Sequence, residues 1–112
     1  MSKHLTVDVS SEGDWYVVSV TGEVDLATAP SLRRALEDAG ESSNAVLADL
    51  SGVSFMDSTG LRVLIAAHQG LEAAGGKFAV VPGDGAVARL LDITGVDDHI
   101  AVYENVSEAV GG

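Results

Sequence analysis

The most informative part of this sequence is residues 49–61, which read DLSGVSFMDSTGL. Residues 45–50 before it are almost all apolar, as in a strand covered on both faces, and a helical spacing of apolar residues begins after Ser58. A hydroxyl residue therefore stands where a buried strand gives way to a helix. Free amides and the helix dipole favour an anion at that point, so Ser58 is either an inert cap or a residue suited to carry phosphate.

The remaining elements follow outward from this junction. An antiparallel hairpin comes first, and helices then alternate with strands, which predicts an α/β fold with a mixed, mostly parallel β-sheet and helices packed on it. Asp84 is expected to cap the third helix. Strands are expected at about 5–9, 15–21, 45–50, 77–81 and 100–103, and helices at about 28–40, 58–74, 84–93 and 107–110.

The composition limits the class of protein. The 112 residues suffice for one domain, and 6 basic against 17 acidic residues leave a formal net charge of −11. Such a surface repels nucleic acid and anionic lipid, so we expect protein partners with basic patches. The absence of Cys excludes disulfides, thiolate catalysis and Cys-ligated metal. Without an apolar leader or a membrane-length apolar run, the chain is expected to be cytoplasmic.

Two interpretations of Ser58 remain open on the residues alone. In the first, Asp57 or Ser58 is a helix cap worth about 1 kcal/mol. In the second, the loop is functional, because it follows a parallel strand at the end where open α/β sheets present their working residues. The small polar run 57–60, Asp-Ser-Thr-Gly, fits either interpretation.

Catalysis is not expected. The run 57–60 is one residue longer than the Asp-Ser-Gly or Asp-Thr-Gly motif of aspartic proteases, and that motif has no second copy here. A serine nucleophile would need a glycine-flanked elbow and a histidine partner, but Met56 stands where the elbow needs glycine. The histidines are isolated and suggest no metal site either: they are His4, His68 and His99.

Residues 83–88, Gly-Asp-Gly-Ala-Val-Ala, match the dinucleotide-binding pattern G-x-G-x-x-A. That pattern belongs to the first strand of a βαβ unit and needs an acidic residue about 20 positions later, at the end of the next strand. Here it lies late in a short acidic chain. A turn with a helix start is the better interpretation, and nucleotide binding is the weaker one.

Three segments together resemble the STAS domain: residues 22–25 (GEVD), 53–61 (VSFMDSTGL) and 90–95 (LLDITG). More narrowly, they resemble the bacterial anti-sigma factor antagonists, because Met-Asp-Ser-Thr-Gly-Leu is specific to that branch. The resemblance runs from about Leu5 to Glu108, so residues 1–112 are expected to form a single STAS domain.

The resemblance implies a partner-switching function. The unphosphorylated antagonist binds an anti-sigma factor, an ATP-dependent serine kinase, and thereby releases a sigma factor. The kinase phosphorylates the antagonist, which ends binding, and a metal-dependent phosphatase of the PP2C type reverses the modification. ATP and metal belong to those partners, so this chain needs no cofactor of its own.

By the same resemblance, Ser58 is the phosphoacceptor, and Asp57, Thr59 and Gly60 belong to the partner-binding loop around it. Asp25 matches the acidic residue of the family's Gly-Glu-x-Asp segment and contributes to docking.

Arg62 departs from the family, which commonly has glycine at this position. Four residues after Ser58 on a helix, its side chain leans back toward Ser58. One hypothesis is that Arg62 pairs with phosphorylated Ser58 and slows dephosphorylation; the other is a solvated arginine that only adjusts docking.

Two rival functions complete the expectations. One is a STAS scaffold in a larger sensory complex. The other is a small-ligand or nucleotide-binding module that uses residues 83–88, which titration with GTP, ATP or NAD would detect.

Overall fold

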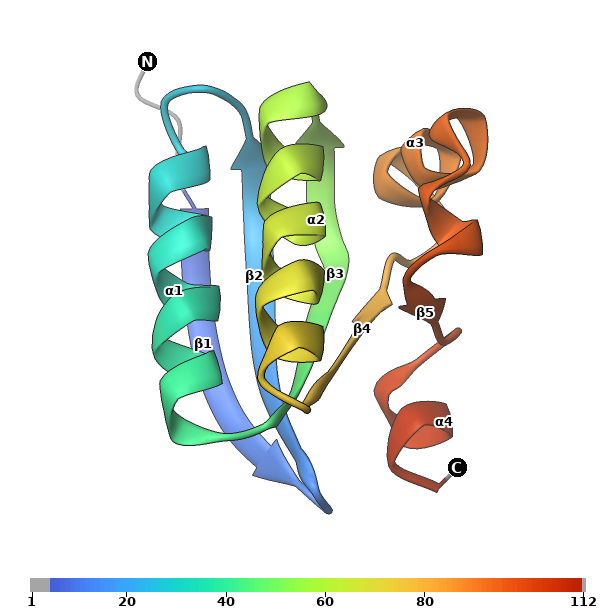
Figure 1. Ribbon diagram of the computed structural model, residues 1–112. Coiled ribbons are helices and arrows are strands. Elements are labelled where there is room, and N and C mark those ends of the chain that lie inside the picture. Colours follow the sequence, from blue (N-terminus) through green and yellow to red (C-terminus); the bar gives the residue numbers. More distant parts are fainter. Residues whose placement is uncertain (1–4, 112) are drawn as a thin grey trace.

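Five strands form one mixed sheet in the order β1-β2-β3-β4-β5 in the computed structural model, which describes residues 5–111 (Figure 1). The first pair is antiparallel and the other three pairs are parallel. The expected α/β class with a mostly parallel sheet is thereby confirmed. The strands are β1 (Leu5–Glu12), β2 (Trp15–Val24), β3 (Ala45–Met56), β4 (Lys77–Val81) and β5 (Ala101–Val102). The helices are α1 (Ala29–Ser42), α2 (Ser58–Ala73), α3 (Ala86–Thr94) and α4 (Val106–Gly111), with a 3-10 turn η1 (Val96–Asp98).

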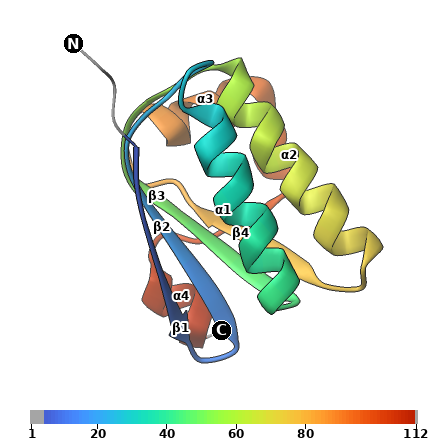
Figure 2. The ribbon, with the colours of Figure 1, turned by 90° about the vertical axis from the view of Figure 1, so that its left-hand side faces the viewer.

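The helices cover the two faces of the sheet unequally. Helices α1 and α2 lie side by side on one face, and the short α4 lies on the other (Figure 2). The larger core forms under α1, α2 and α3, where Val18, Leu32, Leu50 and Leu64 are fully buried. Burial of such side chains stabilises a fold by about 1.5–3 kcal/mol each. None of the described helices is long and apolar enough to cross a membrane.

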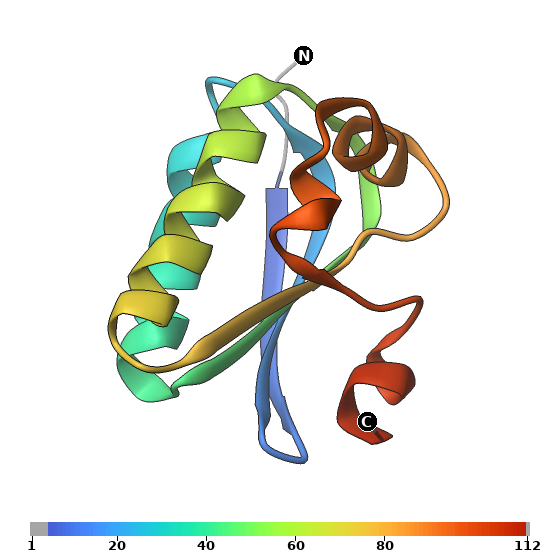
Figure 3. The ribbon, with the colours of Figure 1, turned by 45° about the vertical axis from the view of Figure 1, so that its right-hand side comes forward.

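Helix α4 lies on the opposite face, near the C-terminus (Figure 3). Trp15 packs with Ala109 of α4 in the smaller core on that face. Its indole Nε1 donates a hydrogen bond of 3.2 Å to the carbonyl oxygen of Ala109, and its ring meets Tyr103 edge-on with centroids 6.4 Å apart. The ammonium of Lys77 lies 4.6 Å from the centroid of the Trp15 ring. Trp15 therefore packs at the start of β2 and contacts α4 and β4.

The first three strands are longer than expected, and β1 continues past Val9 to Glu12. β3 continues past Leu50 to Met56, and β2 continues past Thr21 to Val24. The two strands stay paired in parallel through two register shifts, one between Ser19 and Thr21 and one between Gly22 and Glu23. Such irregularities let a ladder continue through a polar stretch that the sequence suggests is a loop.

The expected cap of the third helix was wrong. α3 begins after Gly85, which caps it without a side-chain hydrogen bond, so Asp84 lies outside the helix. Gly83 has a φ of +76°, and this left-handed backbone turns the chain before Asp84 can take the capping position.

Gly60 allows α2 to approach the sheet closely. A β-carbon at this position would lie 2.6 Å from Cγ1 of Val24 and 2.7 Å from Cγ of Met56. Both distances are well below ordinary carbon–carbon contact. The first turn of α2 therefore rests on the ends of β2 and β3, and only glycine fits there without a shift.

Gly60→Ala is expected to lower the free energy of unfolding by about 1–3 kcal/mol, as overpacking does. The matched control is Gly70→Ala in the same helix, where a β-carbon meets nothing within 4 Å. There the higher helix propensity of alanine should raise stability by about 0.5–1 kcal/mol. Urea denaturation of both variants measures the difference. Equal effects at the two positions would contradict the close approach.

Candidate functional site

The ends of β2 and β3 bring two segments together that lie far apart in the sequence. Val24 pairs with Met56 in the parallel ladder. One residue later, the amide of Asp57 donates a hydrogen bond of 3.2 Å to the carbonyl oxygen of Val24. The segment 22–25 and the loop before α2 therefore share one edge of the sheet, at the carboxyl ends of the parallel strands.

Asp57 is the N-cap of α2. Its Oδ1 accepts a hydrogen bond of 2.9 Å from the amide of Thr59 and another from the Thr59 hydroxyl. The Thr59 hydroxyl is the main reason that the pKa of Asp57 lies below its ordinary value. Desolvation opposes this shift, the amides of Thr59 and Gly60 support it, and the negative charge of Asp25 weakly opposes it. The carboxylate is therefore ionised at neutral pH.

Ser58 is the first residue of α2, and it is exposed. Among residues 5–111, no hydrogen-bond partner engages its hydroxyl. The capping role that the sequence left open between two residues belongs to Asp57, so the Ser58 hydroxyl does not serve to hold the helix end.

The loop that carries Asp25 is fixed by its own side chains. The Asp25 carboxylate accepts from the amides of Ala27, at 2.9 Å, and Thr28, at 3.1 Å. The Thr28 hydroxyl donates to the carbonyl oxygen of Glu23 at 2.7 Å and accepts from the amide of Asp25 at 3.0 Å. This ordered loop holds Leu26 in solvent with 77% of its surface exposed.

Sequence reasoning missed both Leu26 and Thr28 as parts of this edge. Thr28 is buried and joins Glu23 to Asp25, but in the sequence it reads only as a helix start. The signal for Leu26 in the sequence was an apolar residue directly after the segment 22–25, and a single exposed apolar residue does not by itself mark a contact surface.

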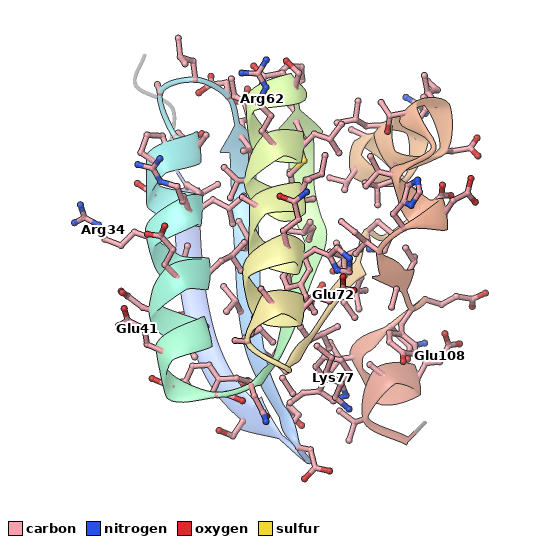
Figure 4. All side chains as sticks on the ribbon, in the orientation of Figure 1. Arg34, Glu41, Arg62, Glu72, Lys77 and Glu108 are labelled. Atoms are coloured by element: carbon pink, nitrogen blue, oxygen red, sulfur yellow. The ribbon has the colours of Figure 1, made fainter. Side chains whose placement is uncertain are left out.

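Gly60 and Arg62 differ in what they offer a partner. Gly60 is buried, so its contribution to the loop is the close packing described above. Arg62 is exposed at the upper end of α2 (Figure 4). It lines a shallow depression between α1 and α2 together with Leu26, Pro30 and Arg33.

The loop 83–88 borders a different depression, lined by Pro82, Gly83 and Tyr103 together with the carboxylates of Asp97 and Glu104. Those two carboxylates repel a nucleotide phosphate, which disfavours the dinucleotide interpretation. Of the histidines, His68 has its Nε2 atom 3.5 Å from Oε2 of Glu72. His4 lies outside the described residues. Residues 5–111 contain no cluster of three or more ligating side chains suited to a metal ion.

The whole chain is similar to proteins of a known family. Residues 6–109 match the family model of the STAS domain. The chain belongs to the STAS-domain family of anti-sigma factor antagonists. It is 36% identical to an anti-sigma-B factor antagonist of Listeria monocytogenes, over 97% of this chain and 96% of that one. It is also 31% identical to the anti-sigma-F factor antagonist RsfB of Mycobacterium tuberculosis, over 96% of this chain and 88% of that protein.

Solved structures agree with this family. An anti-sigma factor antagonist from Mycobacterium paratuberculosis superposes with a TM-score of 0.88 at 35% identity, covering 96% of this STAS chain and 92% of that one. The antagonist SpoIIAA in its phosphorylated form has a TM-score of 0.70 at 17% identity, covering 95% and 97%, and shares the fold. Proteins of this family are regulatory rather than catalytic.

The charge and the cap of Asp57 contribute separately to stability. Asp57→Ala removes both and should lower the free energy of unfolding by about 1 kcal/mol at neutral pH. Asp57→Asn keeps a capping oxygen and removes only the charge. Because the folded-state pKa is lowered, the charge stabilises above the ordinary pKa of about 3.9 and ceases to do so as pH falls through the folded value.

The stability difference between the native protein and Asp57→Asn should therefore be constant from about pH 7 to about pH 5 and shrink below about pH 3.9. Urea denaturation at a series of pH values measures it. A difference that persists unchanged to about pH 2 would contradict the role of the ionised carboxylate.

Proposed function

We propose that this STAS protein is an anti-sigma factor antagonist controlled by phosphorylation of Ser58. In its unphosphorylated form it binds an anti-sigma factor that is a serine kinase. The sigma factor that this anti-sigma factor held is thereby released. The kinase then transfers the γ-phosphoryl group of its ATP to Oγ of Ser58, which loses its proton, and ADP remains with the kinase. A phosphatase of the PP2C type restores the hydroxyl by hydrolysis.

The proposal rests on a difference in hydrogen bonding among the three polar residues of the loop. Asp57 caps α2, and Thr59 is engaged with Asp57, whereas the exposed Ser58 hydroxyl is engaged by nothing in residues 5–111. A kinase can therefore take the Ser58 proton without first breaking an internal hydrogen bond. Thr59, in contrast, would have to leave its carboxylate partner before it could react.

A phosphate on Ser58 changes the charge of the surface and leaves the stability of the fold nearly unchanged. A phosphate adds a charge of about −1.5 to −2 at a helix N-terminus, where amides and the dipole favour it by about 0.3–1 kcal/mol. The nearby carboxylates of Asp57 and Asp25 oppose it. Burying an unpaired charge in an interface costs several kcal/mol, and each 1.4 kcal/mol is a factor of ten in affinity. A docked partner is therefore lost while the domain stays folded.

The first test is phosphoryl transfer from candidate anti-sigma kinases with ATP, followed by intact-mass spectrometry and site mapping. One phosphate on Ser58 is expected, and none in Ser58→Ala.

Thr59→Ala should still accept the phosphate on Ser58, with stability lowered by roughly 1 kcal/mol through loss of its bond to Asp57. Ser58→Glu should bind the kinase more weakly than the native chain. Phosphate on Thr59 alone, or neither binding nor transfer with any candidate, would contradict the proposal.

Arg62 offers a test of how the switch is reversed. If its guanidinium pairs with phosphorylated Ser58, a charge-assisted bond shields the phosphate, and Arg62→Gly should be dephosphorylated several-fold faster. Arg34→Gly is the matched control, because Arg34 points away from α2 on the outer side of α1 (Figure 4). Release of inorganic phosphate by a PP2C-type phosphatase measures both rates. Equal rates for native protein and Arg62→Gly would leave Arg62 as a solvated residue.

A further inference from the structure

A groove runs between α1 and α2 and extends well beyond the Ser58 loop. Two adjoining depressions share Arg33, Val63 and Ala66, so they form one continuous channel between the helices. It begins at Leu26 and Thr59 and ends at Ala74. At a rise of 1.5 Å per residue, its length along α2 is about 22 Å, which matches a helix of about 15 residues.

The floor of the groove is apolar and low. On the α2 side it is formed by small or medium side chains, and at Gly70 a β-carbon would meet nothing within 4 Å. Leu36 and Leu71 are buried beneath it. A pair of helices with such small contact residues leaves room for a third helix to pack at a normal interaxial distance of about 8–10 Å.

The rim charges are separated by sign. Arg33 and Arg62, two of the six basic residues of the chain, stand at the end near Ser58. Glu37, Asp38 and Glu41 stand along the other half. Figure 4 shows Arg62 near the upper end of α2 and Glu41 near the lower end of α1. All five side chains are exposed, and within residues 5–111 none of them forms an ion pair.

We propose that this groove is a docking site for an amphipathic helix of a partner protein. The helix has a stripe of alanine- or leucine-sized residues, carboxylates on the turn that meets Arg33 and Arg62, and basic side chains on the turns that meet Glu37 and Glu41. Its apolar stripe contributes affinity in the manner of helix-in-groove recognition, and the two sets of charges fix its placement along the groove. The proposal does not depend on the modification of Ser58.

Two other occupants, a second copy of this chain and a small molecule, fit the groove less well. A second copy of this chain carries the same net charge of −11, so two copies repel each other before the grooves meet. A small molecule would leave most of an open channel of this length unfilled, whereas ligand sites enclose most of their ligand.

The test uses a helix-stapled peptide of about 15 residues with an alanine and leucine stripe, glutamates on one terminal turn and lysines on the other. Titration into isotope-labelled protein, followed by NMR, should shift the amides of Val63, Ala66 and Gly70 with saturation. A peptide with the same stripe and glutamine at every charged position should bind about tenfold more weakly at low salt, and added salt should reduce this difference.

The matched variants are Gly70→Arg and Gln69→Arg, neighbouring exposed positions that gain the same charge, of which only the first lies in the groove. Gly70→Arg should weaken peptide binding by about tenfold or more and Gln69→Arg should not. Thermal melts of both variants confirm that they fold. Absent or scattered shifts, equal effects of the two variants, or a dimer in sedimentation whose interface is the groove would each overturn the proposal.

Discussion

The contact between the first turn of α2 and the ends of β2 and β3 is the constraint on which this site depends. Because Gly60 has no side chain, the helix meets Val24 and Met56 directly. The hydrogen bond from the Asp57 amide to the Val24 carbonyl then ties the loop to the neighbouring strand. Any side chain at position 60 would lift the helix N-terminus and move Ser58 with it, since Ser58 lies within the same turn.

Within this short run, some residues hold the helix against the sheet, and one residue has no such structural role. Gly60 sets the distance between helix and sheet, Asp57 and Thr59 close the helix end, and Ser58 is left over. The loop of Asp25 is likewise held by its own hydrogen bonds, with Thr28 as the buried link. Both segments are thus ordered before any partner arrives, which reduces the entropy that docking would otherwise lose.

The sequence predicted the architecture well, because the spacing of apolar residues is set by the core. Leu32, Leu36 and Ala39 recur at helical spacing and are all buried under α1. It failed where backbone geometry overrides residue preference. The polar residues 51–52 suggest a loop, yet a shifted register carries β3 through them, and the turn at Gly83 keeps Asp84 from its expected cap. The choice between Asp57 and Ser58 as cap, and the exposure of Leu26, depend on tertiary placement that periodicity does not encode.

Trp15, the single tryptophan of the chain, is the first residue of β2, whereas Asp25 directly follows the last residue of the same strand. Its ring environment is set by Tyr103, Lys77 and the carbonyl of Ala109, all outside the Ser58 edge. The protein therefore carries a native optical probe that lies away from the edge that carries Ser58. Indole emission will report detachment of α4 and global unfolding, and a ligand that binds only at the Ser58 edge will leave it nearly unchanged.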